Sequence, residues 1–76
     1  MEYTDRTLEK IANGYYKIAE AALHSEDAVL RDAAIQGLEE IGSVGALVIL
    51  EAHKEEIGWL ADYLSRVIRD LKQAAQ

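Results

Sequence analysis

The sequence predicts an all-α fold, a compact domain of about four antiparallel helices. Apolar residues recur every three or four positions in four separate segments, which is the period of amphipathic helices. The chain contains no proline, and no segment alternates apolar and polar residues as a half-buried strand does. With 76 residues there is room for a single domain only. We expect helices at about residues 4–24, 26–41, 43–57 and 59–74.

The first expected helix has a continuous apolar arc, and Thr4 or Asp5 can cap its start. The arc consists of Leu8, Ile11, Ala12, Tyr15, Ile18, Ala19, Ala22 and Leu23. Gly14 lies beside the arc, where it costs the helix about 1 kcal/mol relative to alanine. We expect close packing of another helix to compensate for it. Tyr16 lies at the other margin of the arc.

The second expected helix is capped by Ser25 or Asp27 and ends at Gly42, a residue type suited to the left-handed conformation after a helix. One face is apolar and consists of Leu30, Ala33, Ala34, Gly37, Leu38 and Ile41. Ile35 does not fit the pattern, because it projects on the polar side of the helix. It is therefore expected to be exposed.

The third expected helix follows almost at once, with Ser43 as its cap, so it is an antiparallel neighbour of the second. From Val44 to Leu50 it has almost no polar face, and a helix that is apolar all round is buried on several sides. Periodicity also allows a short buried strand here. No second strand-like segment exists to pair with it, so a central helix is favoured.

Gly58 breaks the chain before the last expected helix. The apolar stripe of this helix consists of Leu60, Tyr63, Leu64, Val67, Ile68 and Leu71. Trp59 falls on the polar side. Its ring either folds over the Gly58 bend to close the core or stays exposed for a partner, because tryptophan is enriched in binding hot spots.

The charge of the chain is concentrated in its middle. The net charge is −6, and residues 20–56 carry nine acids against Arg31 and Lys54, a net of −7. Nucleic acids and anionic membranes bind basic surfaces, so direct binding to either is not expected. A partner protein with a basic surface fits this charge. The alternative is that the acids only keep an apolar-rich protein in solution.

No chemistry-bearing motif is present. His24 and His53 are far apart, and neither has the spacing of a metal ligand. Ser25 and Ser43 are better explained as helix caps than as nucleophiles. There is no cysteine and no glycine-rich phosphate loop. We therefore expect no catalytic residue, no metal and no cofactor. The first residues lack the features of a signal peptide, and no apolar run approaches about 20 residues, so a cytoplasmic protein is expected.

Residues 27–52 resemble a HEAT-type helical repeat, in particular the short form of phycobilisome-lyase-like proteins. The resemblance is carried by Asp27, Val29, Arg31, Ala33, Ala34, the segment 37–42 (GLEEIG), Ala46 and Leu50. The proline that often starts the second helix of such a repeat is absent, and one repeat is recognisable. The resemblance implies a HEAT-like central hairpin and a protein-binding scaffold with no catalytic residue.

Two functions are consistent with these features. The first is a small protein–protein interaction module, an adaptor or regulatory protein. The second is an acidic inhibitor, such as a phage anti-defence protein, that blocks a basic nucleic-acid-binding surface. The candidate binding residues are Tyr16, Ile35, Glu39, Glu40, Glu55, Glu56 and Trp59. We also expect a weak homodimer through the apolar margins at Tyr16, Ile35 and Trp59, because a two-fold contact is the commonest way to cover such surface.

Overall fold

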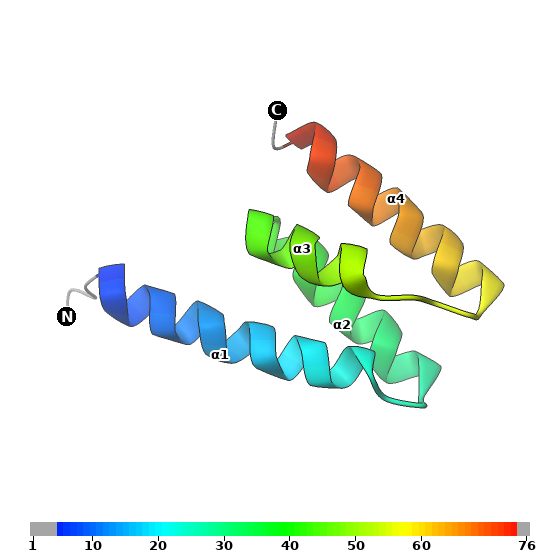
Figure 1. Cartoon of the computed structure of the whole chain (residues 1–76), viewed down its shortest axis with the longest axis horizontal. Coiled ribbons are helices and arrows are strands. Elements are labelled where there is room, and N and C mark those ends of the chain that lie inside the picture. Colours follow the sequence, from blue (N-terminus) through cyan, green and yellow to red (C-terminus); the bar gives the residue numbers. More distant parts are fainter. Residues whose placement is uncertain (1–4, 75–76) are drawn as a thin grey trace.

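The computed structural model describes the backbone of residues 5–74 and the side chains of residues 14–74. The prediction of an all-α fold is confirmed, with four helices and no strand in the described range (Figure 1). The helices are α1 (Asp5–Leu23), α2 (Ala28–Ile41), α3 (Val44–Ala52) and α4 (Gly58–Ala74). Thr4, the alternative first cap, and the side chains of Leu8, Ile11 and Ala12 lie outside the described part.

Helix α2 occupies the centre of the molecule and packs against α1, α3 and α4. Helix α3 also packs against α1 and α4, whereas α1 and α4 make no contact with each other within the described residues. In Figure 1, α1 lies along one edge and α4 along the other, with α2 and α3 between them. The result is an open stack of antiparallel neighbours that measures 44 × 30 × 18 Å.

The turn between α2 and α3 follows the local signals in the sequence. Gly42 adopts the left-handed conformation, with φ of 63°, and its N–H donates to the carbonyl of Leu38. Ser43 then caps α3, because its Oγ accepts the N–H of Ala46 at 3.1 Å. The hydroxyl of Tyr16 also bonds Ser43, which ties α1 to this turn. Both predicted boundaries are confirmed.

The core combines buried side chains from all four helices. It consists of Ala19, Leu23, Ala34, Ile35, Leu38, Ala46, Leu50, Leu60, Leu64, Val67 and Leu71. The predicted stripe of α4 is confirmed, since its members are buried or packed against this core. The prediction that Ile35 is exposed is wrong, because this side chain is fully buried. The buried face of α2 is rotated toward Ile35: Ala34, Ile35 and Leu38 are buried, whereas Leu30, Ala33 and Ile41 of the predicted face are exposed.

Helix α3 is less covered than its sequence predicts. Ala46 and Leu50 are buried, but Val44 and Val48 leave 67% and 61% of their surface exposed. The expectation of burial on several sides is therefore wrong for the outer face of the helix. The reason is that α1, α2 and α4 together cover only its inner side, so an apolar ridge faces solvent.

The third helix is also shorter than expected, ending at Ala52 and not at residue 57. His53 already has an extended backbone, with φ of −85° and ψ of 133°. The segment that follows forms a loop around the buried carboxylate of Glu55, which accepts the N–H of Ile57. This loop brings the carboxylate to Arg31 of α2.

The burial of the two adjacent tyrosines of α1 is the reverse of what their spacing predicts. Tyr15 is exposed, whereas the ring of Tyr16 is half-buried and packs close to Gly45 of α3. Gly14 has no close neighbour among the described residues, since a methyl group there would meet none of their side chains, and no other helix, within 4 Å. The expectation that a second helix packs against Gly14 is therefore wrong.

Gly14→Ala is expected to stabilise the protein by about 1 kcal/mol, which raises Tm by roughly 4–8 °C. Alanine removes the helix-propensity cost of glycine, and the open surroundings impose no steric cost in return. Gly45→Ala is the control, because its methyl group would lie 3.2 Å from the Tyr16 ring. Thermal melts followed by circular dichroism measure both. An unchanged Tm for Gly14→Ala would contradict the expectation.

Candidate binding groove

A groove crosses one end of the molecule, where the α1–α2 turn faces the loop between α3 and α4. It consists of two adjoining hollows of about 670 Å³ and about 170 Å³ that share Leu23, His24, Ala52 and His53. The whole groove is lined by residues 20, 23–26, 31, 48–49 and 52–57. Of the candidate binding residues, only Glu55 and Glu56 belong to it.

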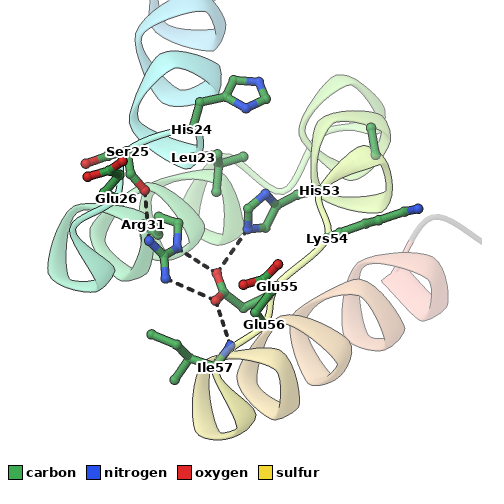
Figure 2. A pocket seen from close by; sticks show the side chains of 11 residues that line it. Leu23, His24, Ser25, Glu26, Arg31, His53, Lys54, Glu55, Glu56 and Ile57 are labelled. Atoms are coloured by element: carbon green, nitrogen blue, oxygen red, sulfur yellow. Dashed lines mark hydrogen bonds and ion pairs between the residues drawn. The ribbon is translucent and has the colours of Figure 1, made fainter.

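The floor of the larger hollow is a hydrogen-bonded cluster around Glu55 (Figure 2). Arg31 donates from Nε to Oε1 at 2.8 Å and from Nη2 to Oε2 at 3.2 Å. The ring of His53 lies 3.1 Å from Oε1, and the N–H of Ile57 donates to Oε2 at 3.1 Å. The Glu55 side chain is only 1% exposed. This one carboxylate thereby joins three parts of the chain: helix α2, the residue after α3 and the residue before α4.

The electrostatics follow from this geometry. The hydrogen bonds from Arg31 lower the pKa of Glu55 to about 2, with support from Ile57 and His53 and against the opposing effect of burial. The same carboxylate raises the pKa of the Arg31 guanidinium. Because both oxygens of Glu55 are already engaged, the group is poorly suited to bind a partner or to act as a general base. We interpret the cluster as structural.

The position of Glu55 differs from the one that the sequence predicted. The sequence placed Glu55 in a helix at residues 43–57 and among the candidate binding residues, but Glu55 is buried and lies in a loop. Its partner Arg31 is 24 positions away. No local pattern links the two residues, so the ion pair could not be read from spacing. Glu56 is exposed and lines the groove.

The other candidate residues do not converge on the groove. Glu39 and Glu40 lie at the opposite end of α2, where Glu39 accepts a hydrogen bond from the Tyr63 hydroxyl at 2.9 Å. Burial and this carboxylate raise the pKa of Tyr63 to about 12. Trp59 is 59% exposed, so its ring does not close the core. Ile35 is fully buried and cannot take part in the expected homodimer.

Three exposed carboxylates gather along the groove, and sequence reasoning had not singled out two of them. Glu20, Glu26 and Glu56 line it and make no hydrogen bond or ion pair with any described residue. They come from α1, the α1–α2 turn and the α3–α4 loop, and they are brought together by the fold. Lys54 also lines the groove, but Figure 2 shows its side chain extending away from Glu55.

The smaller hollow is mainly apolar. It is lined by Leu23, Val48, Ile49 and Ala52, together with Glu20, His24 and His53. Val44 lies one turn before Val48 on the same exposed ridge of α3. An apolar recess next to unpaired carboxylates is typical of a surface that binds another protein.

Within the part of the chain that the structure describes, no three His, Asp or Glu side chains are grouped so that they could hold a metal ion. None of the helices between residues 5 and 74 is long and apolar enough to pass through a membrane. No family model, curated protein or solved structure matches the chain. Function therefore has to be inferred from a small acidic four-helix protein with a partly apolar groove.

Proposed function

We propose that this chain is a small acidic protein–protein interaction module, an adaptor or regulatory binding protein of the cytoplasm, without catalytic activity. The observation that carries the proposal is the exposed ridge of α3, the most apolar helix of the chain. Val44 and Val48 stay exposed there, beside a groove with three carboxylates that have no partner among the described residues. Binding a partner protein would remove this apolar surface from water and neutralise the charge at its rim.

The arrangement of the acids favours this function over the alternative, an acidic inhibitor of a nucleic-acid-binding surface. An inhibitor of that kind presents many free carboxylates in an array. Five of the nine acids between residues 20 and 56 are instead engaged within the chain. They are Asp27, Asp32, Glu39, Glu51 and Glu55. All five are held by partners within the chain, two of them by the cations Lys72 and Arg31, so fewer carboxylates are available to a basic surface.

The stacking of the helices gives further support. Each helix packs against the next in sequence, and α1 also packs against α3 as α2 does against α4. Helical-hairpin repeats stack in this way, and their extended surfaces chiefly bind other macromolecules. We therefore propose that the HEAT-like resemblance of residues 27–52 reflects a binding scaffold with α1 and α4 as its outer helices.

Affinity capture with the tagged chain tests the proposed function. We expect a stoichiometric partner from a lysate of the source cells at physiological salt, with cross-links that involve Lys54 at the groove. The captured partner is then mixed with labelled DNA or RNA. Displacement of nucleic acid by the chain would support the inhibitor instead. Absence of any stoichiometric partner at 50 mM and 150 mM salt would contradict an interaction module.

A further inference from the structure

We propose that the groove binds a basic amphipathic helix of the partner, with one aliphatic side chain in the smaller hollow and lysine or arginine side chains at the acidic rim. This inference rests on the proposed function and specifies its site and the chemistry of its partner. It draws on three independent features: the shape of the hollow, the distribution of charge and the rigidity of the floor.

The smaller hollow is of a size that suits a single side chain of the partner. Its volume of about 170 Å³ is well below the roughly 300–1,000 Å³ of pockets that enclose a small-molecule ligand. The walls from Leu23, Val48 and Ile49 are apolar, which suits an aliphatic group. Val48 and Ala52 of this hollow form an exposed ridge with Val44, which lies beyond it, at four-residue spacing. A helix laid beside this ridge would contact it with apolar residues one turn apart.

The negative charge along the groove favours a basic partner. Glu20, Glu26 and Glu56 are exposed and unpaired among the described residues, whereas the charge of Arg31 is neutralised by Glu55. Within residues 14–74, Lys54 is the one lysine that lines the groove, and three carboxylates outweigh it. Lysine or arginine side chains on the polar face of a docked helix would therefore find complementary charge at both ends of the groove.

The floor keeps the groove in shape without a partner. The Glu55 cluster joins α2 to the α3–α4 loop, and Arg31 also donates from Nη1 to the carbonyl of Ser25 at 2.8 Å. That last bond holds the α1–α2 turn. The three walls of the groove are thus fixed relative to one another, and a preformed site binds with a smaller loss of conformational entropy.

Fluorescence anisotropy with three labelled 18-residue peptides tests the inference. The first peptide carries leucine on one face of a helix and lysine on the other. The second replaces its lysines with glutamate, and the third replaces its leucines with glutamine. We expect binding of the leucine–lysine peptide and at least tenfold weaker binding of the other two. Equal affinity of the leucine–lysine and glutamine–lysine peptides would overturn the inference, because the hollow would then contribute nothing.

Matched variants locate the binding site. Val48→Gln in the hollow is compared with Val29→Gln, since Val29 is also exposed but lies outside the groove. Glu20→Lys at the rim is compared with Glu40→Lys, which changes the net charge equally at an exposed position elsewhere. Each groove variant is expected to weaken peptide binding roughly tenfold, and each control less than about threefold. Equal effects within either pair would refute the groove as the site.

The same variants separate this inference from the proposed function. If the chain captures a cellular partner and Val48→Gln and Glu20→Lys capture it equally well, the groove is not the binding surface although the chain is an interaction module. If no partner is captured, the proposed function fails whatever the peptide affinities are. Melting curves identical to the parent's are expected for both variants, because both side chains are exposed.

Discussion

Leu50→Asp is expected to unfold the protein. Leu50 is fully buried in α3, which, like α2, packs against each of the other three helices. Aspartate at this position would place an unpaired charge in the core or force the helix outward. The cost, about 5 kcal/mol, is comparable with the total stability of a chain of this length, about 4–11 kcal/mol. Circular dichroism should show loss of the helical signal and of the cooperative melt.

Val44→Asp is the matched control for this prediction. Val44 belongs to the same helix but is mostly exposed, and an acid in the first turn of a helix interacts favourably with its dipole. The Tm of the Val44→Asp variant should stay close to that of the parent protein. Leu47→Asp should fall between the two, because Leu47 is half-buried. If Leu50→Asp melted like the parent, the placement of Leu50 in the core would be contradicted.

Glu55→Gln is expected to lower stability at neutral pH by about 2 kcal/mol, or roughly 8–16 °C in Tm. The amide would turn N–H groups toward Arg31 and lose the charge-assisted bonds that the carboxylate accepts. The α3–α4 loop and the α1–α2 turn would be loosened together. Thermal melts at pH 7 measure the effect. Glu56→Gln is the control, since the neighbouring side chain is exposed and unpaired among the described residues, and its Tm should not change.

The pH dependence of the same cluster follows from the lowered pKa. Glu55 has an ordinary pKa of 4.5 when unfolded and about 2 when folded, so between these values the unfolded chain binds more protons. The stabilisation is complete above about pH 4.5 and is lost as the pH falls toward 2. Parent and Glu56→Gln should show this loss, and Glu55→Gln should lack that part of it. Parallel pH profiles for Glu55→Gln and Glu56→Gln would contradict the assignment.

The sequence alone determined the features that depend on neighbours along the chain. The left-handed Gly42 and the Ser43 cap depend on backbone and side-chain groups within four residues, so their residue types predict them. The face of α4 was also predictable, because Leu60 and the other core-facing residues lie on one side of a helix at the edge of the stack. An outer helix buries one stripe only.

The tertiary structure decided what depends on residues distant in sequence. Ile35 is buried because the other helices cover the side of α2 that carries Ala34, Ile35 and Leu38, and the exposed Val48 results from the limited cover of α3. The loop after α3 places Glu55 beside Arg31, which lies 24 positions away in the sequence. The groove exists only because the α1–α2 turn and the α3–α4 loop meet. Periodicity shows which residues share a helix face, but which face is covered, and how fully, depends on how the other helices pack.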